Sequence, residues 1–173
     1  MRRSCQFDPE KALETVLYIA RKAPKPTTYR VLKILYFADK LHLQRFGRQI
    51  CGDDYFALRS GPVPSQTYDM IKDVTDGRTS LFSTHACNSF EVDKHSNRIT
   101  PLREPDTDLF SKSDIGCIEQ SIAENGMLSF PQLREKSHDA AYQSADENDV
   151  IPLRQIIATL PNAELLRDYL ECE

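Results

Sequence analysis

Three neighbouring residues, Ser137, His138 and Asp139, are of the types that form the catalytic triad of hydrolases. In a triad the three side chains must converge in space, because the base takes a proton from the nucleophile while the carboxylate orients the base. Side chains at adjacent positions of a helix or turn do not face one another. The chain also has no G-x-S-x-G elbow, P-loop or G-x-G-x-x-G motif. We therefore expect Ser137 or Asp139 to cap a short helix, and we predict that the protein is not an enzyme.

Candidate metal ligands are equally dispersed. His85 and Cys87 form an H-x-C pair, but a zinc site needs three or four converging ligands. His42 stands in a helical pattern without a second ligand one turn away, and His95 stands in a hairpin loop. The remaining acidic pair, Asp53-Asp54, is placed to shape a turn. The sequence therefore predicts neither a metal site nor a cofactor.

The cysteines point to a reducing compartment. There are 5, an odd number, and no two have C-x-x-C spacing. Such residues behave as small hydrophobic side chains in the cytosol. The N-terminus has no apolar segment of a signal peptide, and no stretch approaches the roughly 18 apolar residues of a membrane span. These features predict a cytoplasmic protein. The residues concerned are Cys5, Cys51, Cys87, Cys117 and Cys172.

Charge argues against a nucleic-acid ligand. The chain carries 22 basic and 26 acidic side chains, a net charge of -4, and its one local basic cluster is Arg2-Arg3. A protein that holds nucleic acid must neutralise phosphates and usually carries a basic excess. A length of 173 residues suits one domain, residues 1–173, with a core of its own.

Two helices must form the body of this domain. Asp8 and Pro9 are typical of a helix start, and Pro24 and Pro26 end that helix. Thr27 or Thr28 caps a second helix, which runs to about residue 46 and is followed by Gly47. Apolar residues cover most of the second helix, including Leu35, which predicts that it is the buried centre of the domain.

The rest of the chain predicts a mixed architecture. Residues 55–59, 90–92 and 98–100 have strand patterns, and we expect them to form one small antiparallel sheet. Pro62 and Pro64 break the first strand and precede a short helix over residues 65–75. The C-terminal third predicts short helices, with capping-box spacing at Ser129 and Gln132. The expected fold class is α+β, a mostly helical single domain.

One stretch resembles a known family. It contains LKILYFADK, then His42-Leu43, Gly52-Asp53 and RSGPVPS, and ends at Tyr68-Asp69. The pattern is similar to the signature of the Panacea domain, also called the SocA-like antitoxin domain. The similarity is strongest over residues 8–75, and Ser137-His138 with Ala141-Tyr142 extends it weakly over residues 128–158. Gln49 stands where the family commonly has Pro, a departure that affects a turn.

The resemblance implies a bacterial or prophage toxin–antitoxin system. The partner would be a cognate toxin encoded beside the antitoxin and neutralised by direct protein–protein binding. The family's second mode is a proteolytic adaptor that delivers the toxin to an ATP-dependent protease. Two alternatives from other classes also stay open, a nucleic-acid-binding regulator and a hydrolase that uses His138.

Within the resembling segment, the residues best suited to an interface are aromatic, basic or part of a rigid turn. Arg59 and Tyr68 flank the turn and are the preferred candidates, because a rigid turn limits the entropy lost on binding. Pro62 and Pro64 fit a strand-to-helix turn better than a contact surface. The full set of partner-binding candidates is Tyr36, Arg59, Pro62, Pro64, Tyr68 and Tyr142.

Overall fold

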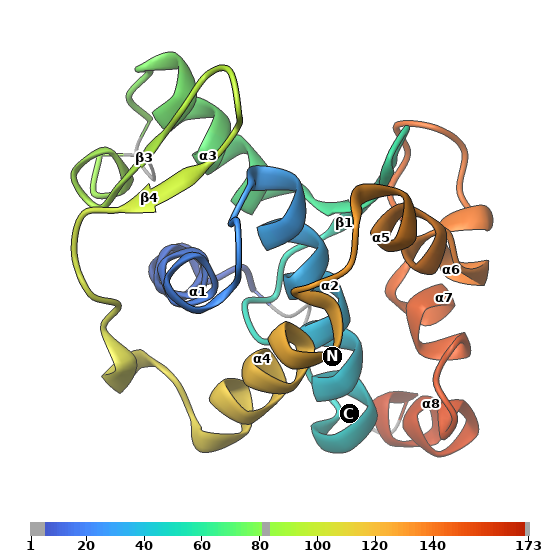
Figure 1. The fold of residues 1–173 in the computed structure, drawn as a ribbon. Coiled ribbons are helices and arrows are strands. Elements are labelled where there is room, and N and C mark those ends of the chain that lie inside the picture. The colour runs from blue at the N-terminus through green and yellow to red at the C-terminus, as the bar shows by residue number, and fades with distance from the viewer. Residues whose placement is uncertain (1–5, 81–83, 172–173) are drawn as a thin grey trace.

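The computed structural model describes residues 6–80 and 84–171. Within those ranges, eight α-helices, two short 3-10 helices and four short strands follow one another, and the helices account for most of the chain (Figure 1). The predicted α+β class with a helical majority is confirmed. The N-terminal elements are α1 (Pro9–Lys22), α2 (Thr28–Phe46), β1 (Tyr55–Leu58), β2 (Gly61–Pro64) and α3 (Ser65–Asp76). The next are η1 (Ala86–Asn88), β3 (Phe90–Val92), β4 (Ile99–Pro101), η2 (Thr107–Leu109) and α4 (Lys112–Asn125), and the last are α5 (Phe130–Ser137), α6 (Ala140–Gln143), α7 (Leu153–Ala158) and α8 (Ala163–Glu171).

Local signals set the ends of the first two helices. The Asp8 carboxylate accepts a hydrogen bond from the Lys11 backbone N–H, and the Thr27 hydroxyl accepts one from the Arg30 backbone N–H. Each cap satisfies an N–H group that the first helical turn leaves without a partner. Gly47 ends α2 in the left-handed conformation, with φ +69°. The predicted bounds of both helices are confirmed.

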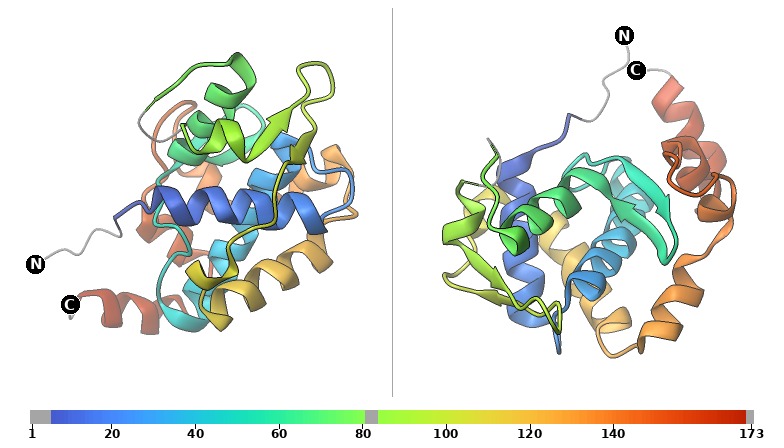
Figure 2. Two further views of the ribbon diagram at one scale, coloured as in Figure 1. Left: turned by 90° about the vertical axis from the view of Figure 1, so that its left-hand side faces the viewer. Right: turned by 90° about the horizontal axis from the view of Figure 1, so that it is seen from above.

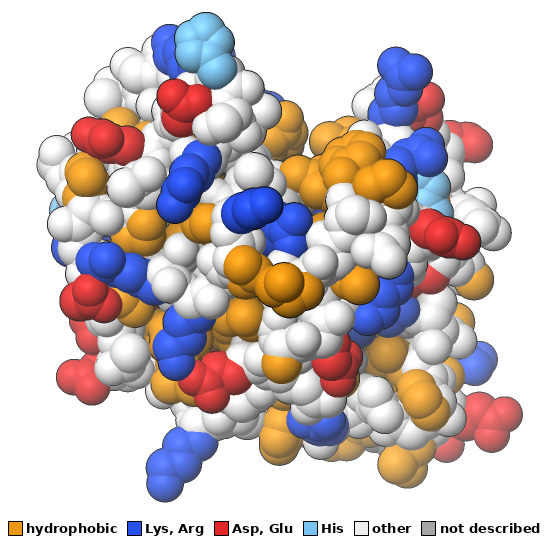
Figure 3. Space-filling view, in the orientation of Figure 1, with side chains coloured by type: hydrophobic (Ala, Val, Ile, Leu, Met, Phe, Trp, Pro, Cys, Tyr) orange, Lys and Arg blue, Asp and Glu red, His pale blue; other side chains and the backbone are white. Residues whose placement is uncertain are grey.

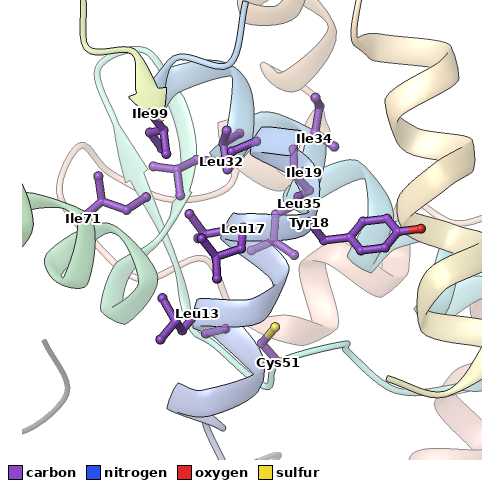
Figure 4. Packing of buried hydrophobic residues seen from close by; sticks show 14 of the residues in the cluster. Leu13, Leu17, Tyr18, Ile19, Leu32, Ile34, Leu35, Cys51, Ile71 and Ile99 are labelled. Carbon is purple, nitrogen blue, oxygen red and sulfur yellow. The ribbon is translucent and has the colours of Figure 1, made fainter. Parts of the chain in front are cut away.

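Helix α2 lies at the centre of the protein. It contributes to one hydrophobic cluster with α1, α3, α4 and β4, and to a second cluster with β1 and α5 to α8. Figure 4 shows the first cluster, where Leu17 of α1, Leu32 of α2 and Ile71 of α3 point toward one another. Figure 2 shows α1 lying between the β3–β4 hairpin and α4. The prediction that α2 is the buried centre is confirmed.

The strands form two separate sheets, so the prediction of one sheet from residues 55–59, 90–92 and 98–100 is wrong. β1 pairs antiparallel with β2, and β3 pairs antiparallel with β4. The partner of β1 is the GPVP segment, which the sequence suggested was a turn because proline cannot donate a hydrogen bond to a sheet. β1 and β2 form a hairpin with a two-residue loop, Arg59-Ser60. Prolines are tolerated in β2 because it is an edge strand, whose outer side needs no N–H donors.

The prolines occupy the outer edge of that hairpin. Ala57 exchanges backbone hydrogen bonds with Asn148 and Asp149 on the far side of β1, so Phe56 is the residue that faces β2 and pairs with Val63. Pro62 and Pro64, on either side of Val63, therefore direct their ring nitrogens away from β1. An edge strand without outward N–H groups cannot pair with another strand.

The C-terminal third is helical, and side chains cap the starts of α4, α5 and α6. Ser111 forms a capping box with Asp114 at the start of α4, and Ser129 forms the predicted one with Gln132 at the start of α5. Asp139, not Ser137, caps α6. Helices α5 to α8 cover the side of α2 opposite α1, whereas α4 packs beside α1 (Figure 1).

Candidate partner-binding site

The tip of the β1–β2 hairpin is held by side chains from other elements. Three backbone carbonyl oxygens near the tip accept hydrogen bonds: that of Leu58 from the Tyr142 hydroxyl (3.0 Å), that of Ser60 from the Tyr29 hydroxyl (3.1 Å) and that of Pro62 from Lys33 Nζ (2.6 Å). These bonds tie the hairpin to α2 and α6. The turn residue Arg59 is therefore exposed on a fixed backbone.

Gly61 allows this close packing. Its φ is +115°, a conformation that residues with a side chain rarely adopt. A β-carbon on Gly61 would lie 2.6 Å from Ser137 Oγ and 3.0 Å from Lys33 Nζ. The hairpin can approach α2 and α5 so closely only because this residue is glycine.

Lys33 is a fully buried lysine beneath the hairpin. Within the described part of the chain no carboxylate lies within ion-pair distance of its Nζ, which is 5.0 Å from the centre of the Tyr29 ring. Burial lowers the pKa of Lys33 to about 7, because the charged ammonium is poorly solvated there. Burial also raises the pKa of the neighbouring Tyr29 hydroxyl to about 12.

An open groove lies beside the hairpin tip. It has a volume of about 820 Å³ and is bounded by the start of α2, the hairpin tip, α3, the β3–β4 loop and α5. We call it the apolar groove. Its apolar lining comes from Leu32, Leu58, Val63, Ile71 and Leu133. Figure 3 shows the molecule hollowed at the top of the view, with hydrophobic and basic side chains bordering the hollow.

Aromatic and basic side chains form the walls of the apolar groove. Tyr68 lies on α3, with Lys72 Nζ 4.6 Å from the centre of its ring. Phe130 lies on α5, exposes half of its surface and packs against the Tyr29 ring with the centroids 4.4 Å apart. Arg30 and Arg59 also line the groove. Arginine and aromatic side chains are the types that dominate the binding energy of protein interfaces.

A smaller hollow adjoins the groove, and we call it the basic recess. Its volume is about 690 Å³, and Arg59, Ser60 and Phe130 line both hollows. Arg134 and His138 line the recess alone, together with one acidic residue, Glu135. Neither Arg59 nor Arg134 forms an ion pair with any residue that the structure describes.

The structure brings two of the six sequence-predicted residues to the groove surface. Arg59 is exposed and lines both hollows, and the half-buried Tyr68 lines the apolar groove. Tyr142 lies behind the hairpin tip, where its hydroxyl bonds the Leu58 carbonyl and its ring stacks on His138 with centroids 4.1 Å apart. Tyr142 therefore holds the hairpin tip in place and does not form part of the groove surface.

The other three predicted residues are buried. Tyr36 has no exposed surface, and its hydroxyl donates to the Asp139 carboxylate at 2.8 Å. Pro62 and Pro64 are buried at the outer edge of β2. These residues hold the hairpin and α6 in position and offer no surface to a partner in this conformation.

Several groove residues escaped the sequence reasoning. Arg30, Lys72, Phe130 and Arg134 come from three helices, and only the packing of those helices around the hairpin brings them to one place. The one local signal is Phe130, a large apolar residue directly after the Ser129 cap, where a helix normally faces solvent.

The side chains of Ser137, His138 and Asp139 have separate partners. Ser137 donates to the Arg134 carbonyl, and Asp139 accepts from Tyr36 and Lys40. Burial lowers the pKa of His138, and the nearby positive charge of Arg134 adds to the effect. The ring of His138 stacks on Tyr142 and lies close to the Ser60 backbone. The three residues do not converge as a triad.

The remaining candidate groups serve the fold. Asp53 accepts hydrogen bonds from the Gln66 and Thr67 backbone N–H groups and from the Thr67 hydroxyl, so it caps α3. His42 lies between the Arg48 carbonyl and the Ser113 hydroxyl. In the described ranges no group of three or more His, Cys, Asp or Glu side chains is arranged to hold a metal ion.

The described cysteines form no disulfide bonds. Cys51, Cys87 and Cys117 are free thiols, and Cys5 and Cys172 lie outside the described residues, as do Arg2 and Arg3. None of the helices in the described residues has the length and apolarity needed to cross a bilayer.

A comparison with known families identifies the family of this chain. The family described as "Antitoxin SocA-like, Panacea domain" matches residues 31–142, well over half of the chain. The chain therefore belongs to the SocA-like Panacea family. The matched segment contains the hairpin, α3 and α5, and it ends at Tyr142 beneath the hairpin tip. No curated protein and no solved structure matches the chain.

Proposed function

We propose that this protein is a cytoplasmic antitoxin that neutralises the toxin of a neighbouring gene by direct, stoichiometric binding. Family membership supports the antitoxin role. The observation that carries direct binding is the apolar groove, which Arg59 of the rigid hairpin lines together with Tyr68 and Phe130, and Arg59 has no ion pair among the residues that the structure describes. A preorganised surface of this composition loses little entropy when it binds a protein.

The arrangement of the polar side chains favours binding over turnover. A hydrolase needs a nucleophile within hydrogen-bond reach of a base. Ser137 Oγ instead donates to a backbone carbonyl, and His138 stacks on Tyr142. We therefore expect His138→Ala to leave neutralisation nearly intact, provided that the domain remains folded.

Co-expression and purified proteins test this function together. Co-expression of the protein with the neighbouring-gene toxin is expected to restore growth, and size exclusion at micromolar concentrations is expected to show a stoichiometric complex. Rescue without association would contradict direct binding. A complex that forms but rescues only in cells with an intact ATP-dependent protease would show instead that the protein acts as a proteolytic adaptor.

A further inference from the structure

The apolar groove and the basic recess form one site with two compartments. Arg59, Ser60 and Phe130 line both, so the two compartments adjoin at these residues. One compartment is floored by aliphatic side chains and the other by charged and polar ones. A single ligand can therefore fill both if it carries an apolar group and a charged group side by side.

The charge of the site is opposite in sign to that of the protein. The whole chain has a net charge of -4, whereas the two hollows together are lined by Arg30, Arg59, Lys72 and Arg134 against Asp76 and Glu135. Lys72 is neutralised by Asp69, and Asp76 by Arg78. The basic side chains left without an ion pair favour a ligand that supplies carboxylates.

The basic recess is suited to one carboxylate in particular. Arg59 lines it from the hairpin tip and Arg134 from α5, and within residues 6–80 and 84–171 neither forms an ion pair. A guanidinium group binds a carboxylate through two parallel hydrogen bonds. The imidazole of His138 lines the same recess. Glu135 is the one acidic group on the recess wall, and it is exposed.

We infer that the two-compartment site binds a segment of the toxin in which a large apolar side chain is adjacent to Asp or Glu. The apolar side chain fills the groove between Tyr68 and Phe130, and the carboxylate lies between Arg59 and Arg134. The occupant is a protein segment and not a nucleic-acid backbone, because phosphate groups make no favourable contact with the aliphatic floor of the groove. This inference rests on the proposed function and specifies the partner surface that the antitoxin recognises.

Strand addition is excluded as the mode of binding at this hairpin. The outer edge of β2 has prolines at alternate positions, and the outer edge of β1 is already bonded to residues 148–151. The segment must therefore be held by its side chains, which makes recognition depend on Arg59, Arg134 and Phe130.

Calorimetry with the purified neighbouring-gene toxin tests the inference. The variants are Arg59→Glu, Arg134→Gln and Phe130→Ala, all at exposed positions, and the matched control is Arg167→Glu on α8, on the opposite end of the molecule (Figure 1). Each groove variant is expected to raise Kd by at least about 10-fold, as loss of an interface hot spot does. The control is expected to leave Kd unchanged. Added salt should weaken the wild-type complex more than the Arg59→Glu complex.

Hydrogen exchange on the same complex locates the contact. We expect protection at residues 58–63, 68–76 and 130–138. If the wild-type protein binds the toxin but Arg167→Glu alone weakens the complex, or protection falls on α8, the inference is overturned while the proposed function stands. If the wild-type protein does not bind the toxin, both are overturned. Binding of a fluorescent single-stranded oligonucleotide that Arg59→Glu abolishes, with toxin binding unchanged, would assign the site to nucleic acid and also overturn it.

Discussion

Replacement of Lys33 by Met should make this protein more stable at neutral and acidic pH. Met has nearly the volume of Lys, so the change removes the buried ammonium without opening a cavity. Burial lowers the pKa of Lys33 from its ordinary 10.5 to about 7, and no carboxylate among the described residues compensates for that burial. By linkage, this difference corresponds to about 5 kcal/mol of unfavourable free energy whenever the lysine is protonated in the folded state.

The substitution also removes a favourable contact. The Pro62 carbonyl oxygen loses the hydrogen bond from Nζ, which costs about 1–3 kcal/mol if nothing replaces it. The expected net gain at about pH 6 is therefore about 2–4 kcal/mol, or roughly 5–15 °C in Tm for a chain of this size.

The gain in stability must shrink at higher pH, because the pKa of Lys33 is lower in the folded state than in the unfolded state. Between about pH 7 and 10 the unfolded wild-type chain binds one more proton than the folded chain, so wild-type stability from this group rises by about 1.4 kcal/mol per pH unit.

Chemical denaturation of both proteins from about pH 6 to pH 10 measures the difference. The difference in unfolding free energy between the two proteins cancels the titration of groups that do not interact with Lys33, such as Tyr18 and Cys117, whose pKa values burial raises. The two stability curves are expected to cross near about pH 9, where the lost hydrogen bond outweighs the relieved charge. A difference in stability that is constant with pH would show that Lys33 is not strained by burial, and the reasoning would fail.

Three further substitutions test the scaffold of the site. Leu35→Asp places an unpaired charge in α2, which belongs to both hydrophobic clusters, so it should cost several kcal/mol by an order-of-magnitude argument; an unchanged melting temperature would show that α2 is not central. Asp53→Ala leaves two backbone N–H groups at the start of α3 without a partner, and denaturation should show a loss of about 1–3 kcal/mol, with Asp54→Ala as the neutral control. Gly61→Ala should cost roughly 1–3 kcal/mol from φ +115° alone, while Gly77→Ala, which has open space around it, should cost less; equal losses would contradict the close approach to Ser137.

The helices could be predicted from the sequence because their signals are local. Asp8, Thr27, Gly47 and Ser129 each cap a helix through bonds within four residues, so sequence spacing alone places the boundaries. The β2 strand could not be predicted, because its two prolines argue against a strand wherever the edge position is unknown. Only the bonds between β1 and residues 148–151 reveal which edge of the hairpin is free.

The candidate site was predictable only in part. Arg59 and Tyr68 flank the GPVP motif, so the sequence alone predicts that both residues lie close to the turn. Phe130 and Arg134 lie about 70 residues further along the chain and join the site through packing of α5 against β2. Tyr36 illustrates the opposite difficulty, because an aromatic residue on an apolar helix has no sequence mark that separates core from surface.

The separation of buried supporting residues from exposed residues around the hairpin has a consequence for how the choice of partner can change during evolution. Lys33 and Tyr142 hold the hairpin from beneath, and Gly61 within the hairpin allows their close approach, whereas Arg59 and Phe130 are exposed at the hairpin tip and on α5. On the proposed function, mutations at these exposed positions alter recognition at little cost in stability, since exposed side chains contribute little to the core. On that function, selection can therefore change the partner that such a site binds through a few surface substitutions while the buried framework stays intact.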